Sequence, residues 1–296
     1  MTRFLIHHAT TYRYAQPVVF GPHRLMLRPR DSHDLRMLDA TLMVSPSAVL
    51  RWSYDVFGNS VAQATFENMA NELTVVSDLH VERYSAEEAQ LGMIAPEAAH
   101  YPFVYSPSDR IDLGGTDQCH YPDPREQLTG YARSFLSDQP ADTLALLTTI
   151  NSAINRDITY SVRYDEGTQA PLDTLQMRSG SCRDLAMLMV ETVRCLGLGA
   201  RFVTGYLYDA ALDGGPGGTV GAGQTHAWLE IYVPGAGWIE FDPTNNSINS
   251  PDLIRVAVTR DAAQAIPLTG SFNGQTNDFL GMEVVVTVRK DVALAA

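Results

Sequence analysis

The first 84 residues alternate apolar and polar side chains over short runs, which is the pattern of half-buried β-strands. Proline, glycine, asparagine and aspartate separate these runs, and Phe57, Gly58 and Asn59 form a turn signal between two of them. Because no helical stretch interrupts the region, residues 1–84 predict an antiparallel β domain of the sandwich or barrel type. The runs are RFLIHHATTYRY, LDATLMVSP, AVLRWSYD, SVAQATFEN and ELTVVSDLHVERY.

The pattern changes at residue 85 and again near residue 125. Residues 85–124 mix helix formers with several prolines, which is typical of a partly ordered connector. Helical spacing follows at 125–136 and 143–158, and after residue 200 the chain returns to strand-like runs. The sequence therefore predicts an α+β protein with a β domain at 1–84, a connector at 85–124 and a second domain at 125–296.

A cysteine opens the most apolar helix that the pattern predicts. Ser181 and Asp184 have the spacing of a helix N-terminal cap, which places Cys182 in the first turn. Unsatisfied N–H groups and the helix dipole at that end stabilise a thiolate and can donate to an oxyanion on a substrate carbonyl. A buried cysteine that only fills space is the competing interpretation, and position alone does not separate the two.

A histidine and an aspartate lie on the two arms of a predicted β-hairpin, QTHAWLEIYVPGAGWIEFDPTNN. With the turn at residues 233–237, Trp228 lies opposite Asp242, and His226 is one diagonal step away on the same face. An aspartate that binds one imidazole nitrogen orients the ring, and the other nitrogen can then serve a thiol. A helix-opening cysteine together with this pair favours a catalytic interpretation over a core histidine.

Composition narrows the remaining possibilities. The chain has 21 basic and 34 acidic residues, a net charge of −13, which disfavours nucleic-acid binding. Apolar stretches are too short for a membrane span, and the first residues lack the features of a signal peptide, so we expect a cytoplasmic protein. Three cysteines cannot make a disulfide framework; Cys195 is interpreted as helix packing, and Cys119 lies in no pattern. No metal or cofactor motif is present, and we expect neither.

These motifs together resemble the transglutaminase-like superfamily of bacterial cysteine-dependent proteins. The resemblance rests on GSCRDLAMLMVETVRCLGLGARFVTGYLYD, on THAWLEIYVPGAGWIEFDPTNN, and on YRYAQPV, LRPR and DVFGN in the first half. It implies a papain-like transglutaminase core after an N-terminal β domain, with Cys182 as nucleophile, His226 as general base and Asp242 as the orienting acid. Met187 departs from the pattern, because many relatives have histidine there.

The resemblance also implies a second oxyanion donor, often a tryptophan upstream of the nucleophile, but this chain has no tryptophan between residues 53 and 227. Tyr160, Tyr164 and Gln176 are the substitutes considered, and each fits packing or a surface position equally well. The glycine-rich segment 209–224 is expected to lie outside the sheet as a mobile flap over the cleft, with a plain surface loop as the alternative.

The resulting hypothesis is a cysteine-dependent acyl-transfer enzyme that acts on peptide or carboxamide bonds through a thioester. A peptidase or amidase is preferred, with a peptide or protein as the substrate and water as the acceptor. A protein-glutamine transglutaminase that uses an amine acceptor is the alternative. A non-catalytic binding module of the same fold is the rival from another class, and the complete set of cysteine, histidine and aspartate argues against it.

Overall fold

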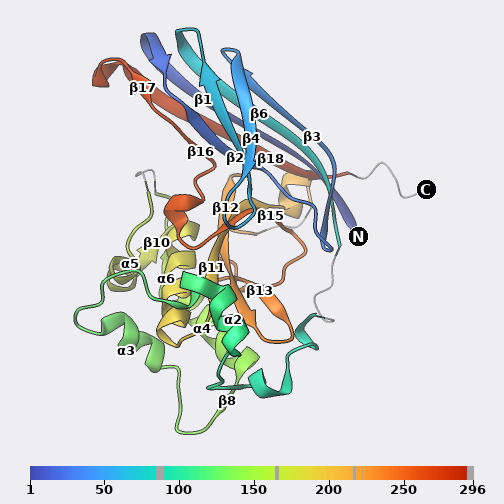
Figure 1. Ribbon diagram of the computed structural model, residues 1–296, viewed down its shortest axis with the longest axis vertical. Helices are drawn as coiled ribbons and strands as arrows, with labels where there is room; N and C mark the ends of the chain where they lie inside the picture. The colour runs from blue at the N-terminus through green and yellow to red at the C-terminus, as the bar shows by residue number, and fades with distance from the viewer. Residues whose placement is uncertain (85–89, 164–166, 216–217, 222, 292–296) are drawn as a thin grey trace.

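The computed structural model describes residues 1–84, 90–163, 167–215, 218–221 and 223–291. Figure 1 shows two units, a β-sandwich at the top and a mixed helix-and-sheet core below it. The mixed fold with mostly antiparallel sheets confirms the predicted α+β class.

The β-sandwich contains two antiparallel sheets. In the first, the strand order is β17-β1-β6-β3, and β18 pairs with the same β1. In the second, the order is β16-β2-β5-β4. The first sheet contains β1 (Thr2–Phe20), β3 (Leu35–Ser45), β6 (Ala70–Arg83), β17 (Phe272–Asn273) and β18 (Phe279–Lys290), and the second contains β2 (His23–Arg28), β4 (Ala48–Tyr54), β5 (Ser60–Phe66) and β16 (Leu268–Thr269).

The last described strands, β16, β17 and β18, lie in this sandwich and not in the core. Strand β18 runs antiparallel along β1, from Phe4 opposite Lys290 to Tyr14 opposite Phe279. The predicted boundary at 125–296 is therefore wrong for the tail, since β16, β17 and β18 all pair with strands of the first 28 residues. The physical reason is that β1 has two edges, and β6 covers only one of them.

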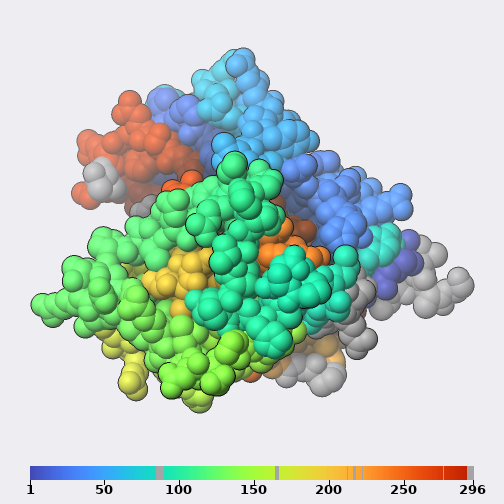
Figure 2. All heavy atoms as spheres, turned by 60° about the horizontal axis from the view of Figure 1, so that its bottom comes forward, coloured from blue at the N-terminus to red at the C-terminus, as the bar shows by residue number. Residues whose placement is uncertain are grey.

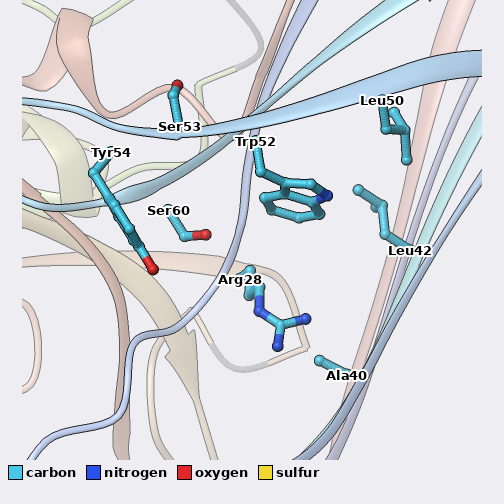
Figure 3. A pocket seen from close by; sticks show the side chains of 8 residues that line it. All are labelled: Arg28, Ala40, Leu42, Leu50, Trp52, Ser53, Tyr54 and Ser60. Carbon is cyan, nitrogen blue, oxygen red and sulfur yellow. The ribbon is translucent and has the colours of Figure 1, made fainter.

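The sandwich contains a cavity lined by residues of both sheets, among them the edge strands β3 and β4. Its volume is about 520 Å³. Figure 3 shows Leu42, Leu50, Trp52 and Arg28 around it. Trp52 is half exposed, and the Arg28 guanidinium lies 5.8 Å from the centre of the indole ring. No residue of the core contributes to its wall.

The core is a five-stranded antiparallel sheet with helices packed on it. The strand order is β14-β13-β12-β11-β15. Helix α6 packs against β11 and β12, and most of its side chains are fully buried because apolar residues surround it. The strands are β11 (Ala200–Leu207), β12 (Thr225–Val233), β13 (Gly237–Asp242), β14 (Ser247–Ile248) and β15 (Leu253–Thr259), and the helices are α3 (Gln127–Arg133), α4 (Thr143–Asp157), α5 (Pro171–Met177) and α6 (Cys182–Cys195).

The predicted connector packs onto this core over the residues that the structure describes. Tyr105 and Leu113 belong to the buried core cluster, and the Tyr105 hydroxyl donates to the carbonyl of Tyr232 at 2.8 Å. Figure 2 shows the green atoms of this region lying over the yellow core. Its elements are η1 (Pro96–Ala98), β7 (His100–Tyr101, paired with β8, Ala141–Asp142), α2 (Pro107–Leu113) and η2 (Gly114–Asp117). Residues 85–89 lie outside the described part.

Buried ion pairs join the sandwich to the core. Arg83 on β6 binds Glu240 on β13, with Nη2 to Oε2 at 2.9 Å, and both side chains are less than a tenth exposed. Arg255 on β15 reaches Asp34 of the sandwich at 3.3 Å and Glu230 of the core at 2.8 Å. Because breaking one partner of a buried pair leaves an uncompensated charge, these contacts fix the sandwich against the strand that ends at Asp242.

Candidate active site

Cys182 is the first residue of helix α6 and is 8% exposed. The carboxylate of Asp184 accepts hydrogen bonds from the backbone N–H and the hydroxyl of Ser181, both at 2.8 Å, as the capping pattern predicted. Asp184 also binds the guanidinium of Arg163 at 2.9 Å. The thiol is therefore held at the positive end of a rigid 14-residue helix.

The hairpin of β12 and β13 has the predicted register. Ile231 lies opposite Ile239, and Val233 opposite Gly237, which leaves three residues in the turn. The same pairing brings His226 and Asp242 together, with Nε2 to Oδ2 at 2.8 Å. Both side chains are nearly inaccessible to solvent, so their interaction is little screened.

Four hydrogen bonds fix the Asp242 carboxylate. Oδ1 accepts from the backbone N–H of Thr244 at 2.9 Å and of Asn245 at 3.3 Å. Oδ2 accepts from His226 and from the side-chain amide of Asn245 at 2.9 Å. Burial alone would raise the pKa of Asp242, but His226 and these donors outweigh it and lower the pKa below its ordinary value. The aspartate is therefore held ionised.

The imidazole is held as a cation. Burial lowers the pKa of His226, but the charge and hydrogen bond of Asp242, with a smaller contribution from Cys182, outweigh it and raise the pKa to about 10. Nδ1 is buried and has no other hydrogen-bond partner among the described residues, so it is the nitrogen left for the Cys182 thiol. Such a cation next to a thiol stabilises the nucleophilic thiolate.

Trp228 forms the wall behind the imidazole. Its indole stacks on His226 with ring centroids 6.0 Å apart and an interplanar angle of 23°. The indole N–H points to Glu240 at 3.4 Å, and Glu240 is the carboxylate that binds Arg83 of the sandwich. The side chain is fully buried.

The sequence did not identify Asn245 as a site residue. Its side-chain amide donates to Asp242 and also to the carbonyl of Val220 at 3.2 Å, while its carbonyl accepts from the Val220 N–H at 2.8 Å. Gly221 follows with φ +87°, and a Cβ there would lie 3.0 Å from His226 Nδ1. The signal was the asparagine pair after Asp242, because asparagine readily binds nearby backbone.

The segment 209–224 therefore adjoins the site. Its described residues lie outside the sheet, as predicted, and include the 3₁₀ turn η3 (Ala210–Asp213). Asp209 accepts from the backbone N–H of Ala211 and of Thr219, both at 2.8 Å. Residues 216, 217 and 222 lie outside the described part, and the motion of this segment stays a prediction.

The three suggested oxyanion donors differ in position. Tyr160, on β9 (Thr159–Tyr160), pairs with β10 (Ser179–Gly180) just before the nucleophile. Burial and, to a smaller extent, the charge of Cys182 raise the pKa of the Tyr160 hydroxyl. A Cβ on Gly221 would lie 4.0 Å from this hydroxyl and 3.0 Å from His226 Nδ1, so the hydroxyl is near the imidazole. Gln176 is exposed and binds Gln127 at 3.0 Å, away from this role. Tyr164 lies outside the described residues. Met187 is fully buried in the core cluster, so it acts in packing.

Comparisons with known proteins agree with this arrangement. Residues 4–82 match the bacterial transglutaminase-like N-terminal region, and residues 129–243 match the transglutaminase-like superfamily. The chain belongs to the transglutaminase-like superfamily. These matches confirm the resemblance inferred from the motifs. Membership of this superfamily identifies the chain, in general terms, as a cysteine-dependent enzyme.

Three similar proteins illustrate the relationship. An uncharacterized protein of Mycobacterium tuberculosis is 29% identical over 99% of this chain and 95% of its own length. A protein-glutamine gamma-glutamyltransferase of Pseudomonas aeruginosa is 37% identical over 23% of this chain and 10% of its own. A crystal structure of a candidate cysteine protease from Cytophaga hutchinsonii has a TM-score of 0.72 at 22% identity, covering 98% of this chain and 90% of that one. The last shows a shared fold.

The described residues contain no cluster of three or more His, Cys, Asp or Glu side chains arranged to hold a metal ion. None of the helices in that part of the chain is both long and apolar enough to span a membrane.

Proposed function

We propose that the chain cleaves peptide or carboxamide bonds by acyl transfer through a thioester on Cys182. The observation that supports this most is the His226–Asp242 pair, whose second imidazole nitrogen is left for a thiol at a helix N-terminus. A thiolate next to an imidazolium is the starting state that such chemistry needs. The assignment of Cys182, His226 and Asp242 as a catalytic triad is part of the proposal.

In the first half-reaction, the Cys182 sulfur attacks the carbonyl carbon and the carbonyl electrons move to oxygen. Backbone N–H groups at the start of α6, with the Tyr160 hydroxyl nearby, are the donors available to that oxyanion. The tetrahedral species collapses as the C–N bond breaks, and the imidazolium of His226 gives its proton to the departing amine. The products are a thioester and a neutral imidazole.

In the second half-reaction, the neutral imidazole takes a proton from water as the water oxygen attacks the thioester carbon. The C–S bond then breaks, which releases a carboxylic acid and restores the thiolate and imidazolium. Asp242 stays ionised throughout and stabilises the cation each time it forms.

We prefer hydrolysis over transfer to an amine because the second half-reaction needs only water. A lysine-type amine is protonated at neutral pH and must lose its proton before it can attack the thioester. The transglutaminase alternative rests on the short match to the Pseudomonas glutamyltransferase. We also propose a peptide or protein substrate and a cytoplasmic location.

A peptide library incubated with the protein, with and without an alkylamine donor, tests the proposal by mass spectrometry. Hydrolysis gives carboxylic acids, either by peptide cleavage with a gain of water or from a carboxamide with loss of ammonia, whereas transfer gives amides that carry the alkylamine. Cys182→Ala is the control and should give neither product. Products that persist in this variant, or no product from the wild-type chain, would contradict the proposed chemistry; the second result would favour the binding module.

A further inference from the structure

A pair of thiols lies at the end of helix α6 opposite Cys182. Cys195 is the last residue of α6, and Cys119 follows η2 in the connector, 76 positions earlier. Their sulfur atoms are 3.3 Å apart. Cys119 is exposed and Cys195 is partly buried. The sequence predicted no contact between the two: Cys195 was interpreted as helix packing, and Cys119 lay in no pattern. No local pattern predicts that the connector returns to this helix.

The backbone on both sides of Cys119 is already fastened to the last turns of α6. The Glu191 carboxylate accepts from the N–H groups of His120 and Tyr121, at 2.9 and 3.1 Å. Arg194 donates to the carbonyl of Thr116 at 2.9 Å and binds Glu191 at 2.8 Å, with neither side chain exposed. Because these contacts hold the two sulfur atoms together in the reduced protein, joining them needs little rearrangement toward a bond of about 2.05 Å.

We propose that Cys119 and Cys195 are a modification site that forms an intramolecular disulfide on reaction with a hydroperoxide. The sulfur of Cys195 attacks one peroxide oxygen and the O–O bond breaks. A sulfenic acid forms, and the other oxygen takes the proton of the Cys195 thiol and leaves as an alcohol or, from hydrogen peroxide, as water. The sulfur of Cys119 then displaces hydroxide from the sulfenic sulfur, and the proton that the attacking Cys119 thiol loses converts this hydroxide to water. Two thiols are oxidised and one peroxide is reduced, with no other reactant.

The surroundings support this order of events. Hydrogen bonds from Cys119 and, at 3.8 Å, from the Thr129 hydroxyl lower the pKa of the Cys195 thiol against the effect of burial. The pKa of Cys119 is raised in return, first by the same contact and second by the partial burial of its sulfur. Cys195 therefore provides the nucleophilic sulfur, and Cys119 keeps the proton until the second step.

The site is separate from the acyl-transfer chemistry. Cys182 and Cys195 lie thirteen residues apart on one helix, a distance of roughly 20 Å along its axis. The disulfide would tie the connector to the far end of α6 and leave the proposed nucleophile free. Since a crosslink that closes a long loop restricts the unfolded chain most, we expect oxidation to raise the melting temperature by about 5–10 °C.

The test uses the full chain with Cys182→Ala, which leaves two thiols. The protein is treated with hydrogen peroxide, unreacted thiols are alkylated with iodoacetamide, and intact and tryptic masses are measured. The expected result is a species lighter by two hydrogens and without alkylation, a linked peptide containing both cysteines, and a higher melting temperature that dithiothreitol reverses. The matched control, Cys182→Ala with Cys119→Ser, should show neither the link nor the thermal shift.

Three outcomes would overturn the proposal. Both thiols could remain open to alkylation after peroxide treatment. One sulfur could instead progress to a sulfinic acid while its neighbour stays reduced. The crosslink could join two chains through the exposed Cys119, which would appear as a dimer on a non-reducing gel. None of these results bears on the proposed hydrolase activity, which the Cys182 experiments test separately.

Discussion

Replacing Asp242 with asparagine changes one atom of the site and tests the role of the buried carboxylate. Oδ1 accepts from two backbone N–H groups, of Thr244 and Asn245, so the amide oxygen of the variant should take that place. Its NH₂ group would then face the imidazole of His226 and the side-chain NH₂ of Asn245. The imidazole could meet this donor only with a deprotonated Nε2, and Nδ1 would carry the proton toward the thiol.

The structure sets the magnitude of the effect. The Asp242 carboxylate is the main cause that raises the pKa of His226 from its ordinary 6.5 to about 10, against the effect of burial. That rise corresponds to roughly 5 kcal/mol of preference for the imidazolium. Without the charge, burial should hold the pKa below 6.5, so the ring is neutral at neutral pH. We expect turnover to fall by about 10³-fold or more, as removal of an orienting aspartate does elsewhere.

Two assays report the change. The rate of Cys182 alkylation by limiting iodoacetamide at neutral pH should fall at least tenfold, because the thiolate loses its cationic partner. The second assay measures the melting temperature as a function of pH. The raised pKa of His226 stabilises the folded wild type fully below pH 6.5 and progressively less as the pH rises through about 10. The variant should lack this alkaline decline.

A second substitution separates stability from chemistry. In the double variant Asp242→Asn with Asn245→Asp, a carboxylate replaces the opposing NH₂ group, so part of the lost melting temperature should return while turnover should not. Wild-type alkylation and turnover in the single variant would refute the reasoning, and a cysteine–histidine dyad would then explain any activity.

The other predictions also use matched pairs of variants. Gly221→Ala should slow alkylation of Cys182 tenfold or more, because this glycine has φ +87° and its new Cβ would lie 3.0 Å from the imidazole. Gly218→Ala should leave the alkylation rate unchanged, because no atom lies within 4 Å of its new Cβ, and equal rates in the two variants would contradict the prediction. Asn245→Ala should lower turnover by about tenfold, because it removes a hydrogen bond to the buried carboxylate of Asp242. Asn155→Ala removes hydrogen bonds to the carbonyls of Pro243 and Thr244 in the same turn, and it should lower the melting temperature more than turnover. Asp34→Asn should lower the free energy of unfolding at neutral pH by about 2 kcal/mol in urea titrations, because two arginines outweigh burial and lower the pKa of this carboxyl from 3.8 to about 2. The wild type should lose the same stability as the pH falls through that range. A variant as stable as the wild type would exclude this contribution.

Local patterns in the sequence predicted most of the proposed site. The capping residues around Cys182 placed the thiol, and hairpin periodicity alone set the register that joins His226 to Asp242. Both depend on neighbours in the chain, where propensity and side-chain alternation are informative.

Contacts between distant segments were not predictable in the same way. The approach of Val220 to Asn245 joins residues 25 positions apart through side-chain-to-backbone bonds, which leave no periodic signature. The contact of Cys119 with Cys195 depends on how the connector folds back over α6. The tail was assigned to the wrong unit because a strand's sequence shows its exposure pattern and not its partner, and β18 pairs with a strand from the opposite end of the chain.

The pairing of β18 with β1 has a consequence for synthesis on the ribosome. Chains emerge from the N-terminus, so β1 and β6 are made early, whereas the strand that covers the other edge of β1 is made after the entire catalytic core. Until then a 19-residue strand keeps a free edge, which can pair with another nascent chain. The core can therefore fold while the sheet that precedes it is unfinished, and that sheet is complete only once β18 pairs with β1.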